Sequence, residues 1–404
     1  LACLLSASRG AWGALLAVGA AWLAWRGLGR LMQGAHTARA WRARLLSFAL
    51  LSLAALLIGL GAVYLLVAAN GAAGQALANR WDLWRDALSL AGDYAFTGLG
   101  LGLFEMPFSI YTLLIHVGYI VNSHNLFLDL LIEQGAIGLG LYAGLLTVAL
   151  VTGVRALRRA RRAYGLVLEA ALASLGVGLA HGLVDDILYG SRGLLLLFAP
   201  LGLLMATCTL ASKEASRQGE AAPALASAKR PMARWLIAGG LLLAGALFAW
   251  RPLAAAWQAN LGALAQTRVE LTVYDQRHFD NPNLDQVRQT QNLDEALYRF
   301  ARALALDPGN LTARRRSAQI ALARGDYATA RLHMERAWAD GHRDRTTRLL
   351  LGDALVATGD PVLAVEVIRG LPWARARLEG QAWSRYRGAP QEADVQQALR
   401  LLDR

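Results

Sequence analysis

Charged residues are scarce in this chain of 404 residues: Asp, Glu, Lys and Arg make up only 17%, whereas 55% of the residues are hydrophobic. Long runs of Leu, Ala and Gly separate the few charged clusters. This composition places the chain among membrane proteins before any motif is considered.

Cysteine is also nearly absent, since the chain contains only Cys3 and Cys208, far apart in apolar segments. This pattern indicates neither a disulfide framework nor a cysteine-based metal site, and we expect no cofactor. An initiator Met and a signal-peptide n-region are lacking as well, because the chain opens with Leu1 inside an apolar run. We therefore expect a fragment, or a numbering that begins inside a longer protein.

Six apolar stretches are long enough, or nearly so, to cross a bilayer as helices. The last of them is short, and tilting, local thinning or snorkelling of Arg251 would let it span. The stretches cover about residues 1–25, 45–69, 126–152, 166–188, 193–211 and 235–250.

Basic residues gather in every second loop between these stretches, around residues 26–44, 155–162 and 213–234. The positive-inside rule assigns such loops to the cytoplasm, so residues 70–125 and everything after residue 250 face the periplasm. Because membrane spans separate the basic loops, the positive charge is a topology signal and argues against a nucleic-acid partner.

The tail after residue 250 is polar and repeats itself with helical periodicity. Ala296, Ala330 and Ala364 are each 34 residues apart, a period typical of tetratricopeptide repeats. The small residues let paired helices approach closely, and such arrays bind peptides or partner proteins. We predict repeats at about residues 277–310, 311–344 and 345–378, with Pro361 at the start of a helix.

These features predict an all-α fold, with a polytopic helical membrane part and a soluble, tetratricopeptide-like α-solenoid. The membrane domain takes residues 1–211, with five spans and a periplasmic loop at 70–125. The rest is a flexible cytoplasmic linker at 212–234, a sixth span at 235–250 and a periplasmic repeat domain at 251–404.

Within the predicted periplasmic loop, Trp81 and Trp84 suit an amphipathic helix anchored at the membrane interface. Gly98, Gly100 and Gly102 follow. They indicate a tight re-entrant turn rather than a dinucleotide-binding loop, because the spacing is wrong and no βαβ pattern surrounds them.

The stretch VNSHNLFLDLLIEQGAIGLGLY, residues 121–142, begins an apolar helix with polar side chains. Ser123 or Asn125 can cap the helix that starts near Leu126, while His124 sits at headgroup level. A helix N-terminus also suits an anion, and a neutral imidazole at that depth can take a proton from a hydroxyl. The structural and the functional interpretation are therefore compatible.

Asp129 and Glu133 are four residues apart and share one face of this helix. A carboxylate in the hydrocarbon is costly, so it normally faces the bundle interior with a partner. The two carboxylates either fix helix packing or lie behind His124 and orient its neighbours.

Other candidate residues stand on the same side of the membrane as His124. Arg9 ends the first span, and Arg80 lies in the large loop, where Arg85 is a neighbouring alternative. Each arginine is either a snorkelling anchor or part of a clamp for a diphosphate, which the guanidinium fork matches. His181 and Asp185, four residues apart in the fourth span, either pin the helix end as a local pair or contribute to the site.

Together these motifs resemble the bacterial O-antigen ligase and O-antigen polymerase superfamily. His124-Asn125, then nine residues, then Gly135, two residues and Gly138 match its pattern. SRG at residues 8–10 and RWDLWRDAL before GLGLGLF are also similar, and the resemblance covers roughly residues 1–211. Members of the superfamily have more than six spans, so we expect the N-terminal half of the fold to be missing.

The resemblance implies a partial C-type glycosyltransferase bundle, that is, an inverting, metal-independent enzyme of the bacterial inner membrane. It would take a glycan from undecaprenyl diphosphate at the periplasmic face. The acceptor hydroxyl would lie on lipid A-core for a ligase, or on another lipid-linked glycan for a polymerase.

The same resemblance implies roles for the candidate residues. His124 would be the base that deprotonates or orients the acceptor hydroxyl. Arg9 and Arg80 would bind the diphosphate and stabilise it as the leaving group. The supporting residues would be Asn125, Asp129, Glu133, Arg85, His181 and Asp185.

Two alternatives of other classes stay open. One is a non-catalytic membrane scaffold that displays the repeat domain, which would tolerate loss of His124 and the arginines. The other is a transporter that uses Asp129, Glu133 and Asp185, although no inverted repeat is visible among the spans.

Overall fold

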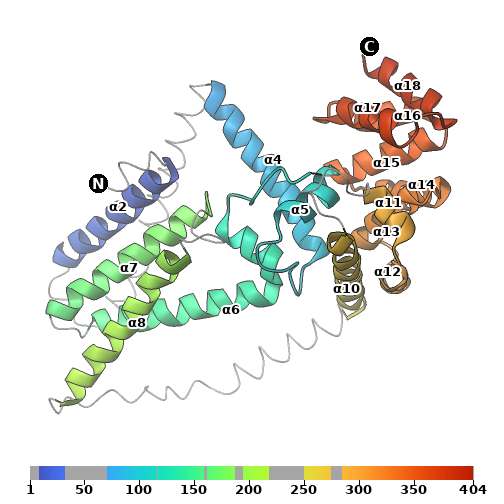
Figure 1. Cartoon of the computed structure of the whole chain (residues 1–404). Coiled ribbons are helices and arrows are strands. Elements are labelled where there is room, and N and C mark those ends of the chain that lie inside the picture. The colour runs from blue at the N-terminus through green and yellow to red at the C-terminus, as the bar shows by residue number, and fades with distance from the viewer. Residues whose placement is uncertain are drawn as a thin grey trace. The chain divides into compact units, whose positions relative to one another are not determined.

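The computed structural model describes residues 9–31, 71–115, 117–158, 162–186, 194–217, 250–273 and 284–403. Every regular element within these ranges is a helix (Figure 1), so the predicted all-α class is confirmed. The predicted spans at 45–69 and 235–250, and most of the predicted linker, lie outside the described residues.

The described helices fall into two compact units. Two long helices, α4 (Gly71–Asp93) and α6 (Leu126–Leu157), contribute residues to both. Unit 1 comprises Leu1–Arg85, Asn122–Leu130 and Ile137–Lys229, and unit 2 comprises Asp86–Val121, Leu131–Ala136 and Arg230–Arg404. The later part of the predicted periplasmic loop is thus built into the same unit as the repeats.

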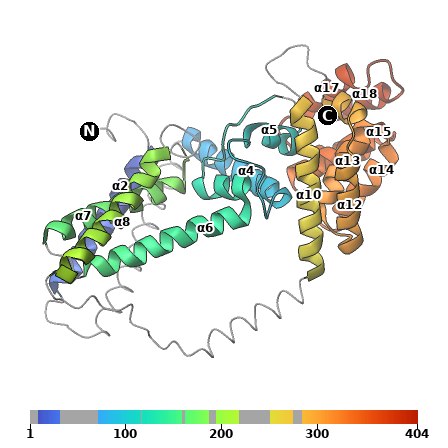
Figure 2. The same cartoon turned by 60° about the horizontal axis from the view of Figure 1, so that its bottom comes forward.

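Unit 1 contains α2 (Arg9–Leu31), α7 (Arg162–Gly182) and α8 (Leu194–Arg217) besides its share of α4 and α6. Helix α7 packs against both α2 and α8, as Figure 2 shows. Apolar side chains at helical spacing make this possible, and the buried core contains Leu126, Leu130, Tyr142, Leu146, Ala149, Leu168, Ala171, Leu175, Leu201, Leu204 and Cys208.

Two helices of the described part are long and apolar enough to cross a membrane, α6 and residues Tyr164–Gly182 of α7. Only 17% and 22% of the residues in their most apolar windows are buried, whereas a core helix of a soluble protein is mostly buried. They overlap the predicted spans at 126–152 and 166–188. In α2, the stretch Gly10–Ala24 is apolar but shorter.

Helix α6 is kinked at Gly135, which has φ 68° and ψ −176°. A Cβ there would lie 2.2 Å from the carbonyl oxygen of Phe96, and a Cβ on Gly98 (φ 69°) would lie 2.2 Å from that of Glu133. The backbone N–H of Gly100 donates to this same Glu133 carbonyl, at 3.0 Å. Only glycine allows both the positive φ and the close approach of the two backbones. Gly135 and Gly98 are therefore required by the packing of α6 against the segment after α4.

Unit 2 is built mainly from helices that pair with their neighbours along the chain (Figure 1), in particular α13 with α14 and α15 with α16. Helix α12 packs chiefly against α10, and a π-helix, η1 (Phe108–Leu113), follows the short α5 (Glu105–Pro107). The helices are α10 (Trp250–Val273), α11 (Leu284–Thr290), α12 (Asp294–Leu306), α13 (Leu311–Ala323), α14 (Tyr327–Ala339), α15 (Arg345–Ala357), α16 (Pro361–Ile368), α17 (Ala374–Ser384) and α18 (Gln391–Leu402).

The periodic small residues lie where helices of the repeats meet. Ala296, Ala330 and Ala364 are all buried, at 0 to 1% exposure. Asp360 caps α16 by accepting from the backbone N–H of Leu363, and Pro361 occupies the first turn, as predicted. Local signals therefore define the helix starts, while the alanines define the packing face.

The segment after α4 is held by the repeats through one buried guanidinium. Arg316 of α13 is 1% exposed, forms an ion pair with Asp93 at 2.7 Å and donates to the hydroxyl of Tyr94 at 3.0 Å. Its guanidinium carbon also lies 3.3 Å from the ring centroid of Tyr111. Burial raises the pKa of Tyr111, so the phenol stays neutral and donates to Glu270 at 2.8 Å.

Further repeat helices bind the same segment along its length. Arg315 donates to the hydroxyl of Ser89 at 2.6 Å. The hydroxyl of Thr346 donates to the carbonyl of Thr112 at 3.1 Å, and Arg377 donates to that of Leu114 at 2.7 Å. Side chains of α13, α15 and α17 therefore satisfy polar groups of residues 89–114, and the segment is an integral part of unit 2.

Replacing Arg316 with Met should lower the free energy of unfolding of unit 2 by about 3–5 kcal/mol, because Asp93 would be left buried without its partner. Replacing both residues, as Asp93→Leu with Arg316→Met, should recover much of this loss. Urea unfolding of the purified full chain measures the change in the free energy of unfolding. Arg302→Met is the control, because Arg302 is an exposed residue of α12. Equal free energies of unfolding for Arg316→Met and Arg302→Met would contradict the conclusion that the buried Arg316–Asp93 pair holds unit 2 together.

The repeat unit should also lose stability in acid through Asp344, which caps α15 and pairs with Arg315. Burial opposes ionisation of Asp344, but the Arg315 charge and hydrogen bonds from Thr347 outweigh it and lower the pKa. A lowered folded-state pKa means that the contribution is complete above the ordinary Asp value of about 3.9 and is lost as pH falls below it. In Asp344→Asn, the urea midpoint should fall less steeply between pH 4 and pH 2, by roughly one titrating group. An unchanged acid limb would refute this.

Candidate functional site

The turn at residues 122–125 precedes α6 and is fixed by its own polar groups. Asn125 caps the helix, since its side-chain oxygen accepts from the backbone N–H of Phe127 and Leu128, each at 3.1 Å. The capping interpretation of Asn125 is therefore confirmed. Its amide nitrogen also donates to the carbonyl of Leu183 at 3.0 Å, which ties the turn to the end of α7.

His124 stands in this turn with a left-handed backbone, φ 54°, which is uncommon for a residue other than glycine. Its Nδ1 lies 3.3 Å from Oδ1 of Asp185, and its side chain is 43% exposed. The backbone N–H of Asp186 also donates to Oδ1 of Asp185, at 3.0 Å. A neutral imidazole whose Nδ1–H donates a hydrogen bond to a carboxylate keeps Nε2 as an acceptor, which is the tautomer a base requires.

The interpretation of His181 and Asp185 as a local pair is not what these contacts show, because Asp185 faces His124 instead. The backbone carbonyl of His181 accepts from Val184 and Asp185, which forms the turn at 183–186. Within the described part of the chain, Nε2 of His181 is buried without a hydrogen-bond partner. His181 lies beside Gly10, whose Cβ would be 3.6 Å from that nitrogen.

The two candidate arginines of the clamp are placed differently. Arg80 of α4 donates from Nη1 to the carbonyl of Val184 at 2.6 Å, directly beside Asp185. Arg9 is the first residue of α2, and its side chain lies outside the described atoms. The next residue, Gly10, abuts the same turn, because a Cβ there would lie 3.1 Å from Val184. The start of α2 therefore lies next to the residues that bind Arg80.

Among the described residues, no contact joins Arg85 to the turn at residues 183–186. It is exposed and lies 3.7 Å from Asp82, three residues earlier on α4. That pair is a weak surface interaction. Of the two loop arginines, the geometry therefore favours Arg80.

The two acidic residues of α6 belong to different units. Asp129 is 1% exposed and accepts from the backbone N–H of Ser123 at 2.9 Å, so it holds the residue directly before His124. Glu133 belongs to unit 2, where its carbonyl accepts from Gly100. The group formed by Arg80, His124, Asn125 and Asp185 around the turn at 183–186 is called the His124 cluster below.

One contact beside the His124 cluster could not be predicted from the sequence. The indole N–H of Trp84 donates to the carbonyl of Ser123 at 3.0 Å, whereas the sequence indicated only a membrane anchor. Arg80 and Trp84 are four residues apart and share one face of α4, which was the signal available. No group of three or more His, Cys, Asp or Glu side chains in the described ranges is arranged to hold a metal ion.

Asn125→Ala should destabilise the purified chain by about 1–2 kcal/mol, because both the cap and the bond to Leu183 are lost. Asn125→Asp should cost less, since a carboxylate still accepts from the helix N–H groups. The thermal midpoint in detergent measures both, with the exposed Asn79→Ala as control. A midpoint of Asn125→Ala equal to that of the control would contradict the capping role.

Two family models match the chain. Residues 1–143 match that of the O-antigen ligases, and residues 288–346 match that of the tetratricopeptide repeat. The first match includes Arg80, His124 and Asn125 of the His124 cluster, whereas Asp185 lies beyond it. Neither a curated protein nor a solved structure matches the chain. The resemblance noted in the sequence is thus confirmed over these ranges: residues 1–143 are similar to the O-antigen ligases, and residues 288–346 are similar to the tetratricopeptide repeat.

Proposed function

We propose that the chain is a glycosyltransferase that moves a glycan from undecaprenyl diphosphate to an acceptor hydroxyl during cell-surface polysaccharide assembly. The O-antigen ligase match supports a membrane role in glycan transfer or polymerisation, and two described helices could cross a bilayer. The observation that carries the proposal is the placement of His124 against Asp185 at the mouth of α6.

His124 acts as the base of this reaction. The acceptor hydroxyl gives its proton to Nε2 while its oxygen attacks the anomeric carbon of the donor. The bond from that carbon to the diphosphate oxygen breaks, and attack from the opposite face inverts the configuration. Asp185 holds the ring through Nδ1 and stabilises the imidazolium that forms, as in other His–carboxylate pairs.

Arg80 and Arg9 stabilise the departing diphosphate. The bond from Arg80 Nη1 to the carbonyl of Val184 holds the guanidinium beside the His124 cluster, and its other N–H groups can donate to phosphate oxygens. Arg9 immediately precedes Gly10, which abuts Val184. Because charge develops on the leaving group in the transition state, this electrostatic contribution is a large one.

The proposal implies a location and partners. We place the chain in the bacterial inner membrane as a multi-pass protein with its repeat domain in the periplasm, where lipid-linked glycan is available. The acceptor is lipid A-core for a ligase or a second lipid-linked glycan for a polymerase, and the repeats offer a surface for a protein partner. The reaction needs no metal ion.

His124→Ala, expressed in a cell depleted of the wild-type gene, should insert normally yet lower glycan transfer by about 10²–10⁴-fold, the usual contribution of a general base. Undecaprenyl-linked glycan should then accumulate, as followed by gel analysis of extracted lipids. His342→Ala, in the turn before α15, is the matched control and should transfer normally.

The accumulating species separates the two candidate reactions. Full-length chains left on the lipid indicate a missing ligation step, whereas single repeat units indicate a missing polymerisation step. Full complementation by His124→Ala would refute the catalytic assignment and favour the scaffold, in which the repeat domain is the working part.

A further inference from the structure

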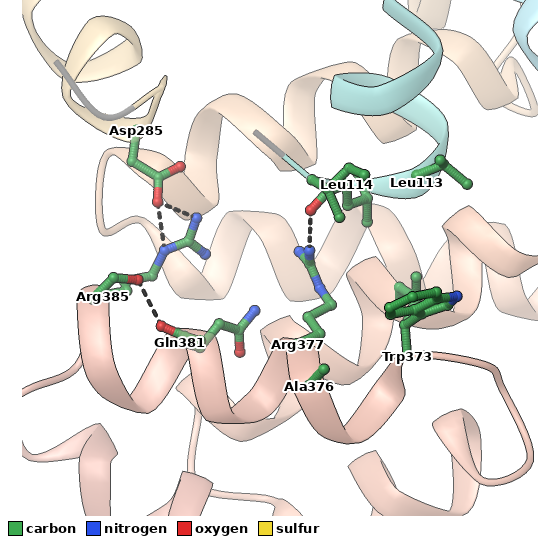
Figure 3. A pocket seen from close by; sticks show the side chains of 12 residues that line it. Leu113, Leu114, Asp285, Trp373, Ala376, Arg377, Gln381 and Arg385 are labelled. Carbon is green, nitrogen blue, oxygen red and sulfur yellow. Dashed lines mark hydrogen bonds and ion pairs between the residues drawn. The ribbon is translucent and has the colours of Figure 1, made fainter. Parts of the chain in front are cut away.

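Unit 2 contains a cavity of about 280 Å³ between the end of η1 and helix α17 (Figure 3). One wall comes from residues within the O-antigen ligase match, Leu113 and Leu114, and the other from α17 and its two flanking residues, at Trp373, Arg377, Gln381 and Arg385. A neighbouring cavity of about 20 Å³ has room for a single water. The larger cavity exceeds that by an order of magnitude, so it can hold a small ligand group.

Gln381 is the first sign of such a ligand. Its side chain lines the cavity between Arg385 and Arg377 (Figure 3) and is only 7% exposed. Both its Oε1 and its Nε2 are buried without a hydrogen-bond partner among the described residues. A buried amide left unpaired is costly, and a ligand that both donates and accepts would remove this cost.

Trp373 is the second sign. It precedes α17 in a left-handed conformation, φ 69°, which a side chain adopts only with strain. Its indole is 63% exposed at the rim of the cavity and meets the ring of Tyr119, itself 62% exposed, edge to face. An exposed indole held in a strained turn presents a flat apolar face to whatever enters.

The charges around the cavity are already balanced, which bears on the class of ligand. Arg385 donates to the carboxylate of Asp285 at 2.8 Å, and Arg377 donates to that of Asp353 at 3.0 Å. An anionic ligand would have to compete with these carboxylates. A neutral ligand with hydroxyl groups would not, and each hydroxyl can both donate and accept.

We propose that this cavity binds one neutral sugar residue of a glycan. The C–H face of the sugar ring stacks on Trp373. One sugar hydroxyl accepts from Nε2 of Gln381, and another donates to its Oε1. Leu113 and Leu114 contact a methyl-bearing substituent such as an acetamido group. The proposal rests on the proposed function for the origin of the sugar, because Leu113 and Leu114, which lie within the O-antigen ligase match, line the cavity.

A peptide is the less favoured occupant. Arg315, Thr346 and Arg377 of three repeat helices already bind the chain's own residues 89–114. The remaining cavity is at the lower limit of small-molecule sites, about 300 Å³, and seats one compact group rather than a row of side chains.

Saturation-transfer NMR and titration calorimetry on the full chain in detergent test the proposal, with N-acetylglucosamine, glucose and glucuronate as probes. N-acetylglucosamine should bind with a Kd on the order of 1 mM, about −4 kcal/mol, and glucuronate at least tenfold more weakly. Gln381→Leu removes the amide at nearly constant volume, and Trp373→Gly suits the left-handed conformation, so both should fold. Each should weaken N-acetylglucosamine binding at least tenfold.

Trp383→Ala is the matched control, because Trp383 lies on the same helix, is 70% exposed and stacks on Arg387 outside the cavity. It should bind like wild type. Absence of sugar binding, or binding that neither Gln381→Leu nor Trp373→Gly weakens, would overturn the proposal. So would binding of a capped leucine-rich pentapeptide that these two variants abolish, which would show a peptide site. His124→Ala should bind the sugar normally, so the failure of this inference is distinguishable from failure of the proposed reaction.

Discussion

The candidate site depends on how the chain pairs the free backbone N–H groups at the start of α6. Asn125 accepts from two N–H groups of the first turn, and Asp129 accepts from the N–H of Ser123. His124, between these anchors, is held with φ 54°, a conformation that a free turn would rarely keep. Asn125 and Asp129 are therefore explained first by their bonds to the backbone at the start of α6. The turn that they fix leaves the imidazole of His124 exposed.

Polar contacts also join the turn before α6 to the turn after α7. Three consecutive residues of the second turn each bind one member of the cluster: Leu183 accepts from Asn125, Val184 accepts from Arg80, and Asp185 meets His124. An imidazole, a carboxylate and a guanidinium are thus positioned by short polar contacts between two turns. Preorganised groups of this kind are what stabilisation of developing charge requires.

Local and distant features differed in how well the sequence predicted them. The cap at Asn125, Pro361 at a helix start and the alanines at intervals of 34 residues follow from local propensity and periodicity, and each was predicted. The partner of Asp185 was not, because a spacing of four residues offered His181 as a local alternative while the true contact, with His124, spans 61 residues. Likewise, nothing local marks Arg316 as buried, since its partner Asp93 lies 223 residues away.

The most direct measurement is the rate of glycan transfer by the purified full chain carrying Asp185→Asn. This change keeps the shape of the side chain but removes the charge that, in the proposed reaction, stabilises the imidazolium. We predict a kcat at least about 100-fold below wild type, with membrane insertion and thermal midpoint unchanged, and a normal rate for the exposed Asp82→Asn. A wild-type rate in Asp185→Asn, with His124→Ala inactive, would contradict the claim that this pair performs the chemistry.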